Sequence, residues 1–413
     1  MPAFTIDSTR LNRTLEELGR FGDTSKGMQR IAFSPADIAG REYTISLMRG
    51  AGLETGIDTA GNIIGRRAGS SPGLPAIALG SHTDTVPSGG KYDGALGVMA
   101  AIEAVQTLAD NRGTLRHPVE TLVFTNEEGT RYHRWLIGSR AMAGLLEPED
   151  LTAVDDEGVH LSVRMAGIGG DLSRIGEAAR KPGELAAYFE LHIEQGPTLF
   201  QSKVPVGVVT AITGRSVFEV EIKGMSNHAG TTPMSARRDA LVSASRLVLA
   251  VQRLAAELEV CRVATVGSVQ TLPNAVNVIP GNVRLGLEFR DVSMEGLTAA
   301  EAELRRVAAE ISDSDGLEMA IQRHRTSRPV PIQPHMQALV EEAAGRCGLA
   351  YTRLPSGAGH DAQAMAAITE AAMLFVPSVD GISHAPEEFS SPEDCANGTQ
   401  ALLELLLLAD ERL

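Results

Sequence analysis

Short apolar runs alternate with helical patterns along the first half of the chain, and this alternation constrains the fold more than any other feature. The runs at 76–80, 121–125 and 187–191 predict buried strands, and 373–376 predicts a fourth, much later in the sequence. Between the first two runs, apolar residues recur at helical spacing over 94–109. Strands that alternate with helices predict an α/β domain with a mainly parallel sheet and helices on both faces.

A second pattern begins after Gly214. Four segments there predict strands and two apolar stripes predict helices, in the order β-α-β-β-α-β. This order is the split βαβ arrangement of ferredoxin-like α+β domains. The segments are 217–223, 263–271, 283–292 and 317–322, and the stripes are Ala244, Leu247, Val251 and Leu254, and Ala300, Leu304, Val307 and Ile311.

The chain then returns to the first pattern. Two more helices and the strand at 373–376 are expected, and the last helix starts at Ser391, whose side chain can cap it. We therefore expect two domains. Residues 1–212 and 329–413 would form a discontinuous larger domain, and residues 213–328 an inserted smaller one.

Charge and cysteine content narrow the class of protein. Asp and Glu number 52 against 37 Lys and Arg, and this net charge of -15 argues against nucleic acid as the main partner. Three cysteines lie far apart without paired spacing, which favours a reducing compartment. No apolar stretch predicts a signal peptide or a membrane span. We therefore expect a cytoplasmic protein without a membrane partner.

Four predicted strands lead into side chains that can bind metal ions, and a fifth such side chain precedes the helix at 94–109. The candidates are His82, Asp93, Glu128, His192 and His384. Because ligands of open α/β sheets lie beyond the carboxyl ends of the strands, these groups should converge on one edge. Imidazole and carboxylate are the ligands expected for zinc, manganese or cobalt. Five of them without cysteine suit two ions bridged by one carboxylate, which activate water and polarise a carbonyl.

Two neighbouring carboxylates suggest a division of labour. Glu127 and Glu128 are adjacent, so one can bind metal while the other faces water and acts as a general base. Asp84, two residues beyond His82, is a candidate for a carboxylate that fixes the tautomer of this histidine. Each of these residues taken singly is more often structural, so the hypothesis depends on the whole set occurring at strand ends.

The order of motifs along nearly the whole chain resembles the hydantoinase/carbamoylase family of amidases. The stretches that carry the likeness are 80–85 (GSHTDT), 89–94 (GGKYDG), 127–131 (EEGTR), 190–196 (ELHIEQG), 227–234 (NHAGTTPM), 277–280 (NVIP), 356–361 (SGAGHD) and 383–388 (SHAPEE). The family comprises dinuclear metallo-amidohydrolases that act on N-carbamoyl-L-amino acids, allantoate, ureidoglycolate and β-ureidopropionate. The chain departs from it at Asn126, where a third Glu is common, and at Tyr132, where Phe is usual.

The resemblance implies two divalent ions per subunit (Zn, Mn, Co or Ni), with Asp93 bridging them and Glu127 acting as the base. His82 and His192 would either lie on opposite ions or share one with Asp93, while Glu128 and His384 would hold the second ion. The grouping we favour is His82, Asp93 and His192 for one ion, and Asp93, Glu128 and His384 for the other. It also implies that the inserted domain is a lid and a homodimerisation module. From that domain, His228 would reach the active site of the partner subunit and steady the developing oxyanion.

Substrate-binding residues follow partly from the sequence and partly from the resemblance. Arg290 lies on the face of the predicted strand 283–292 opposite to its apolar residues, where an arginine can hold a carboxylate bidentately. The resemblance adds Gln195, Asn277 and Gly359. Together these residues indicate a small ureido or amide acid as the substrate.

The function implied is hydrolysis of the ureido C–N bond of an N-carbamoyl-L-amino acid, or a related ureido acid, to amine, ammonia and carbon dioxide. Allantoate or ureidoglycolate amidohydrolase, an aminoacylase or dipeptidase of the same superfamily, and a non-catalytic metal-binding protein are the alternatives. A serine hydrolase is disfavoured because residues 224–228 (GMSNH) miss the nucleophile-elbow pattern at the last position.

Overall fold

The computed structural model describes residues 4–413, which divide into two compact units. Unit 1 runs up to Thr210 and continues from Ile332 to the end of the chain, and unit 2 comprises Ala211–Pro331.

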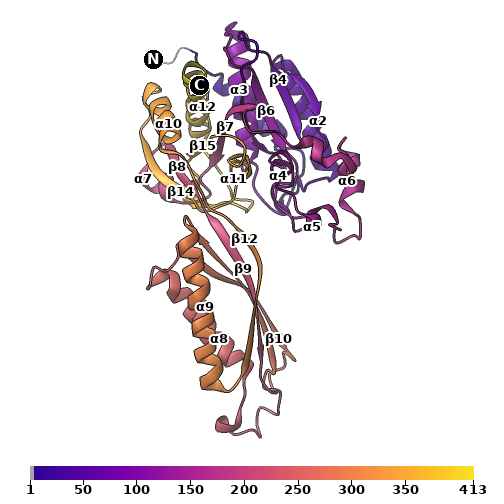
Figure 1. Cartoon of the computed structure of the whole chain (residues 1–413), viewed down its shortest axis with the longest axis vertical. Helices are drawn as coiled ribbons and strands as arrows, with labels where there is room; N and C mark the ends of the chain where they lie inside the picture. Colours follow the sequence, from indigo (N-terminus) through magenta and orange to yellow (C-terminus); the bar gives the residue numbers. More distant parts are fainter. Residues whose placement is uncertain (1–3) are drawn as a thin grey trace. The chain divides into compact units, whose positions relative to one another are not determined.

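A nine-stranded mixed sheet forms the centre of unit 1 (Figure 1). Its strands are β3 (Glu54–Ile57), β4 (Ile63–Arg67), β5 (Ala76–His82), β6 (Val119–Phe124), β7 (Leu185–Ile193), β8 (Val206–Ile212), β13 (Val330–Pro331), β14 (Tyr351–Ser356) and β15 (Ala371–Val376). They follow the order β13-β8-β15-β7-β5-β6-β4-β3, and β14 pairs with β8. Strand β13 and the last two residues of β8 fall within the sequence bounds of unit 2. The neighbours β15, β7, β5 and β6 are parallel, whereas β13, β8, β4 and β3 pair antiparallel.

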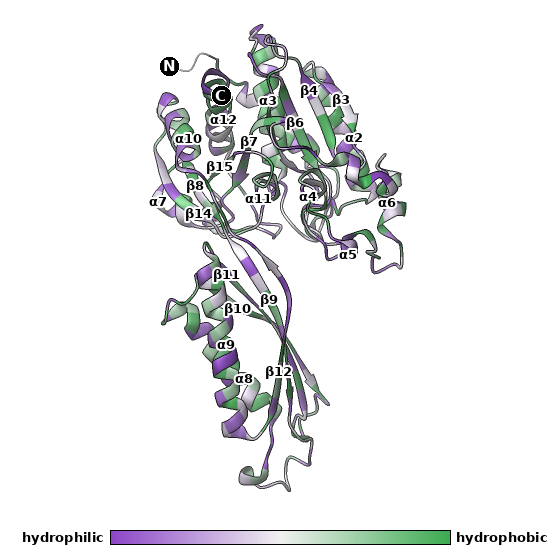
Figure 2. Ribbon diagram, in the orientation of Figure 1, coloured by the Kyte–Doolittle hydropathy of each residue, from purple (hydrophilic) through white to green (hydrophobic). Residues whose placement is uncertain are grey.

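The parallel centre confirms the α/β sheet predicted from the sequence, since the four predicted strands are β5, β6, β7 and β15. Every residue of β5, β6 and β15 is buried. In Figure 2, hydrophobic residues are seen in the sheet around the labels β4 and β6. The antiparallel flanks were not predicted, because edge strands such as β3 are short and largely exposed and so lack a continuous apolar run.

Helices cover both faces of this sheet. The helices of unit 1 are α1 (Ser8–Leu18), α2 (Pro35–Gly50), α3 (Ala95–Asp110), α4 (Ile137–Met142), α5 (Pro148–Leu151), α6 (Leu161–Gly167), α7 (Thr198–Ser202), α10 (Pro334–Arg346), α11 (Asp361–Met365) and α12 (Pro392–Arg412), with 3-10 turns η1 (Leu172–Ala178) and η3 (Val379–Gly381). A short hairpin is formed by β1 (Asp23–Thr24) and β2 (Gly27–Met28).

Alternate residues of β7 face different helical layers. Leu191 packs against Gly398 of α12, which in turn lies beside α3. Its neighbour Glu190 accepts a hydrogen bond from the backbone N–H of Ala362 in α11 at 2.8 Å. The helices α3 and α12 therefore cover one face, and α11 covers the other, next to α4. Ser391 caps α12 by accepting from the N–H of Asp394, as predicted.

Unit 2 is the ferredoxin-like domain predicted from the β-α-β-β-α-β order (Figure 1). Its elements are β9 (Gly214–Lys223), the 3-10 turn η2 (Met234–Ala236), α8 (Ala240–Ala256), β10 (Val263–Leu272), β11 (Asn282–Asp291), α9 (Met294–Asp315) and β12 (Glu318–Ser327). The four strands form an antiparallel sheet in the order β10-β11-β9-β12. Its apolar face packs on the two helical stripes, and Leu247, Leu285 and Leu304 are fully buried there.

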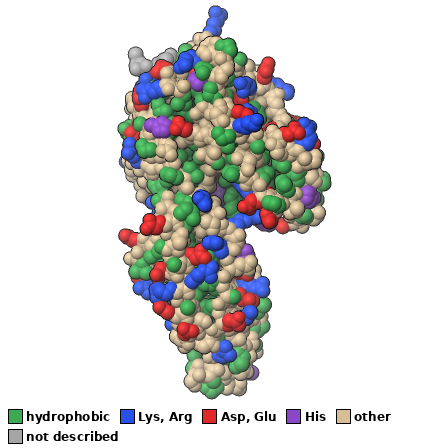
Figure 3. Space-filling view, viewed as in Figure 1, with side chains coloured by type: hydrophobic (Ala, Val, Ile, Leu, Met, Phe, Trp, Pro, Cys, Tyr) green, Lys and Arg blue, Asp and Glu red, His purple; other side chains and the backbone are tan. Residues whose placement is uncertain are grey.

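The exposed surface carries charges of both signs. On the face drawn in Figure 3, Lys and Arg side chains are interspersed with Asp and Glu over unit 2. On α9, Arg305 pairs with Glu301 at 2.9 Å across one helical turn. Within the described part of the chain, no helix is both long and apolar enough to cross a membrane.

Candidate active site

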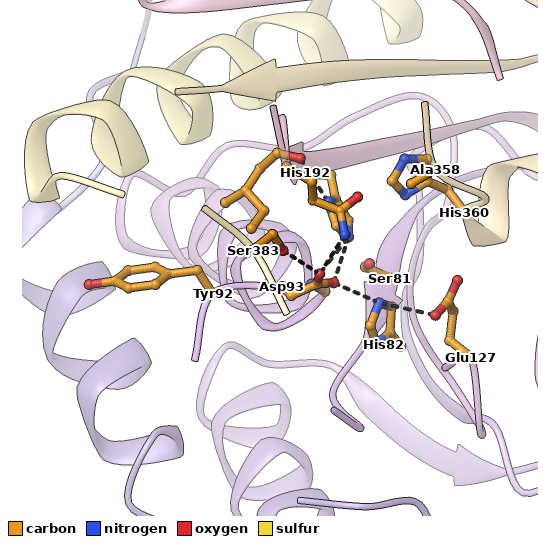
Figure 4. Close-up of polar contacts among 12 residues, drawn as sticks. Ser81, His82, Tyr92, Asp93, Glu127, His192, Ala358, His360 and Ser383 are labelled. Carbon is orange, nitrogen blue, oxygen red and sulfur yellow. Dashed lines mark hydrogen bonds and ion pairs between the residues drawn. The ribbon is translucent and has the colours of Figure 1, made fainter. Parts of the chain in front are cut away.

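The predicted site residues of unit 1 gather at the carboxyl ends of the parallel strands (Figure 4). His82 is the last residue of β5, and His192 lies near the end of β7. Glu127 follows β6, and Asp93 precedes α3. Parallel strands bring their carboxyl ends to one edge, so the topology alone juxtaposes residues from distant segments.

A first group of possible ligands consists of His82, Asp93 and His192, all buried. Asp93 Oδ1 lies 3.5 Å from His82 Nε2 and 3.3 Å from His192 Nε2. In a tetrahedral zinc site with ligands about 2.0–2.1 Å from the ion, ligand atoms lie about 3.3–3.4 Å apart. The spacing of this group therefore fits an ion between the three side chains.

Backbone carbonyls fix the tautomer of both histidines. His82 Nδ1 lies 3.0 Å from the carbonyl oxygen of Asp84, and His192 Nδ1 lies 3.0 Å from that of Ile193. Because a carbonyl oxygen can only accept, each Nδ1 carries a proton, and Nε2 is left as the ring nitrogen that can bind a cation. Here the structure differs from the sequence-based expectation, since the backbone of Asp84 and not its carboxylate contacts the ring at hydrogen-bond distance.

The carboxylate of Asp84 instead holds the turn that carries the two glutamates. Its oxygens accept from the backbone N–H of Glu127 at 3.1 Å and of Glu128 at 3.2 Å. Asn126 begins this turn at φ 54°, a left-handed conformation that asparagine tolerates better than most residues. Its side chain donates to the carbonyl of Arg134 at 2.7 Å. Asn126 therefore supports the turn and is a member of neither ligand group.

A second group consists of Asp93, Glu128 and His384, so Asp93 belongs to both groups. Asp93 Oδ2 lies 3.3 Å from His384 Nε2, and Glu128 Oε1 lies 3.7 Å from the same nitrogen. Glu128 Oε1 is buried and has no hydrogen-bond partner. A buried carboxylate oxygen without a partner is costly, and a cation at this place would satisfy it.

The charges of the site also favour bound cations. Burial raises the pKa of Glu128 to about 8 and that of Glu127 well above its usual range. Hydrogen bonding to Asp93 raises the pKa of His384 to about 9. For His82, burial acts to lower the pKa, but Glu127, Asp93 and Asp84 outweigh it and raise the pKa well above its usual range. Such shifts are typical of crowded carboxylates that cations neutralise.

Gly94 allows Asp93 to approach the histidines. It adopts φ 62°, and a Cβ built on it would lie 2.4 Å from Cε1 and Nε2 of His82. Only glycine fits both requirements, because other residues disfavour this backbone conformation and would collide with the ring. Its N–H also points to His192 Nε2 at 3.2 Å.

Sequence reasoning missed a third buried group, formed by Glu190, His192 and His360. Glu190 already accepts hydrogen bonds from Ser81 Oγ, Tyr188 Oη and the N–H of Ala362. His360 bonds to Ser356 Oγ at 2.7 Å, and its ring packs edge-on against His192 with centroids 4.5 Å apart. Glu190 and His360 thus have hydrogen-bond partners without an ion, and we interpret this group as packing that holds the ring of His192 in place. The sequence did offer one indication of this group, because a glutamate two residues before His192 is unusual in an otherwise apolar strand.

The remaining predicted residues lie in different places. Gln195 belongs to unit 1 and donates from Nε2 to Asp93 Oδ2 at 2.6 Å, whereas Gly359 lies in an exposed loop before α11. His228, Asn277 and Arg290 belong to unit 2. The backbone N–H of Ala229 donates to the carbonyl of Asn277, so the exposed loops of His228 and Asn277 are joined. Arg290 Nε donates to Glu288 on the same strand face at 2.8 Å.

Comparison with known proteins places this geometry in a family. The model of the protein family described as Peptidase family M20/M25/M40 matches residues 78–408 of this chain. The chain belongs to this family. An amidase of the hydantoinase/carbamoylase family from Burkholderia multivorans has a crystal structure that is similar with a TM-score of 0.89 and 38% identity, over 100% of both chains. This likeness confirms the predicted fold and places the M20-family chain in the hydantoinase/carbamoylase amidase group.

Named hydrolases are among the relatives of this M20-family chain. It is 39% identical over 402 residues to the N-carbamoyl-L-amino-acid amidohydrolase of Paenarthrobacter aurescens, covering 97% of this chain and 98% of that protein. It is 36% identical over 409 residues to the ureidoglycolate hydrolase of Arabidopsis thaliana, covering 97% and 86%. The chain is an amidohydrolase that acts on C–N bonds.

Proposed function

We propose that this amidohydrolase cleaves the ureido C–N bond of an N-carbamoyl-L-amino acid or a closely related ureido acid. The products are the free amine, ammonia and carbon dioxide. The observation that carries the proposal is the pair of ligand groups that share Asp93, with the carboxylate of Glu127 beside them. The relative from Paenarthrobacter aurescens supports the choice of an N-carbamoyl-L-amino acid.

Two divalent ions, of zinc, manganese, cobalt or nickel, are proposed to lie in the two groups. Such ions polarise a carbonyl oxygen and lower the pKa of water. Histidine nitrogens and carboxylate oxygens suit these metals. Asp93 would contribute one oxygen to each group, since Oδ1 faces His82 and His192 while Oδ2 faces His384.

Glu127 is proposed as the general base and acid. Its Oε2 lies 3.6 Å from His82 Nε2, at the edge of the first group, and its side chain is largely buried. A carboxylate that stands beside the ligand groups without belonging to either can take a proton from the attacking water. Glu127 then gives this proton to the leaving nitrogen when the C–N bond breaks.

His228 is proposed to stabilise the oxyanion, from the partner subunit of a homodimer formed through unit 2. His228 Nδ1 accepts from the backbone N–H groups of Gly230 at 3.0 Å and Thr231 at 3.2 Å. The neutral ring therefore carries its proton on Nε2, and its exposed tip is a hydrogen-bond donor. A donor of this kind is what a developing oxyanion requires.

Arg290, Asn277, Gln195 and Gly359 are proposed to bind the substrate. Arg290 offers a guanidinium to the substrate carboxylate, which would compete with Glu288 for it. The exposed backbone of Gly359 and the amide of Gln195 offer further polar contacts.

A substrate panel tests the proposed reaction. N-carbamoyl-L-amino acids should give a kcat/KM at least about tenfold higher than allantoate, ureidoglycolate, N-acetyl amino acids and dipeptides, because substrate choice depends on contacts to the leaving group. Ammonia and free amine are measured together. Preference for allantoate or ureidoglycolate would favour those alternatives, and release of amine without ammonia would favour an aminoacylase or dipeptidase. The panel is repeated after the divalent ions have been removed with a chelator. Turnover that persists without the ions would favour a serine hydrolase.

A mixing experiment tests the shared site. His228→Ala and Glu127→Gln subunits should each be nearly inactive, and their mixture should recover about a quarter of wild-type activity, because half of randomly assembled dimers are mixed and each holds one intact site. Differently tagged subunits allow the mixed dimer to be isolated and counted. A mixed dimer that forms without any recovery would contradict a site completed by the partner subunit.

A further inference from the structure

Glu388 is a buried carboxylate that belongs to neither ligand group. It lies four residues after His384 in the loop that follows η3, and only 4% of it is exposed. Its direct neighbour Glu387 is exposed. A carboxylate buried to this extent requires hydrogen-bond donors around it.

Four donors converge on this carboxylate. Oε1 accepts from the backbone N–H groups of Tyr92 and Asp93, both at 3.0 Å. Oε2 accepts from Ser383 Oγ at 2.8 Å and from the backbone N–H of His384 at 3.4 Å. One side chain thus joins the segment of Asp93 to the segment of His384, which lie nearly 300 residues apart in the sequence.

Both joined segments need such support. His384 adopts φ 55°, a left-handed conformation that is uncommon outside glycine and that persists only when its surroundings hold it. Ser383 Oγ also lies 3.3 Å from Asp93 Oδ2, so its one proton lies between the carboxylates of Glu388 and Asp93, and Figure 4 shows this side chain pointing at Asp93. The Glu388 carboxylate therefore fixes the backbone from which both Asp93 and His384 project.

Gly90 is an independent sign that this contact is built into the chain. A Cβ on Gly90 would lie 2.3 Å from both Cβ and Oε1 of Glu388. Its backbone does not need a left-handed conformation, so the requirement for glycine here is space alone. The missing side chain at Gly90 therefore leaves the space that the Glu388 side chain occupies next to the loop before Asp93.

We propose that Glu388 is a positioning residue that holds Asp93 and His384 at the separation required to bind the second ion. The inference rests on the proposed function, because it assumes that Asp93, Glu128 and His384 hold a metal. Partners that orient metal ligands typically change metal affinity by about 10–100-fold when they are replaced.

Cobalt titration of metal-free protein, followed by absorption, tests this role without measuring activity. In Glu388→Gln, one oxygen can still accept from Tyr92 and Asp93, but the new NH₂ group faces the N–H of His384 and cannot accept from it. We expect one of two cobalt ions to bind about 10–100-fold more weakly, with the other nearly unchanged. The melting temperature of the metal-free variant should match that of the wild type.

Glu387→Gln is the matched control and should bind both ions as the wild type does. Gly90→Ala, which displaces Glu388 without removing its charge, should weaken the second ion and, because it also disturbs the bonds to the N–H of Asp93, the first ion as well. It serves as the test if Glu388→Gln fails to fold. Two ions bound with wild-type affinity in these variants would overturn the inference. Wild-type protein that binds fewer than two ions would instead overturn the proposed function, whatever the variants do.

Discussion

Asp93→Asn should lose both metal ions and nearly all activity. Asp93 is the one side chain shared by the two ligand groups, with Oδ1 3.3 Å from His192 Nε2 and Oδ2 3.3 Å from His384 Nε2. An asparagine of the same shape keeps one oxygen but puts an NH₂ group, which cannot bind a cation, at the other position. We expect each ion to bind at least about 100-fold more weakly, more than when a ligand only loses its supporting partner.

Elemental analysis after dialysis and kcat with an N-carbamoyl-L-amino acid check this expectation. Asp110→Asn is the control, because Asp110 is an exposed residue at the end of α3 that pairs with Arg10 and belongs to neither ligand group. Asp93→Asn protein that keeps two ions and turns over substrate at a normal rate would show that the two groups do not share this carboxylate.

Glu127→Gln should keep both ions and lose turnover. Glu127 is not a member of either ligand group, and its carboxylate stands beside them at 3.6 Å from His82 Nε2. Glutamine has the same size but cannot take a proton from water at neutral pH. General acid–base catalysis contributes about 10²–10⁴-fold, so kcat should fall by that factor while KM changes little.

Steady-state kinetics and metal content are measured on the same samples. Glu149→Gln, at an exposed glutamate on α5, controls for the loss of one negative charge. If Glu127→Gln retained near-normal kcat, the proton would have to be transferred by another group. If it lost an ion, Glu127 would be a ligand and Glu128 would become the candidate for the base.

The sequence pattern predicted the possible ligands because their position depends on topology alone. His82 and His192 end two parallel strands, and parallel strands expose their carboxyl ends at one edge whatever the side chains between them. The same reasoning applies to Asp93, which precedes α3 between β5 and β6. The inserted ferredoxin-like unit was predictable for a similar reason, because its strands and helices carry clean periodic patterns.

Residues whose role depends on long-range contacts were not predicted. Glu388 stands in a motif with His384, but its bonds to Tyr92 and Asp93 become visible only in three dimensions. Likewise, the role of Asp84 differs from the expectation, because the chain turns so that the Asp84 carbonyl, and not its carboxylate, meets His82. The spacing of two residues between His82 and Asp84 predicts that they lie close together, but it does not predict which atom of Asp84 contacts the ring.

The proposed reaction requires two cations, one on either side of Asp93. Crystals of catalytically active protein, measured at the absorption edge of the bound metal, would locate them. We expect two anomalous peaks per chain, one among His82, Asp93 and His192 and one among Asp93, Glu128 and His384. Active protein with no peak there, or with peaks at other residues, would contradict this requirement.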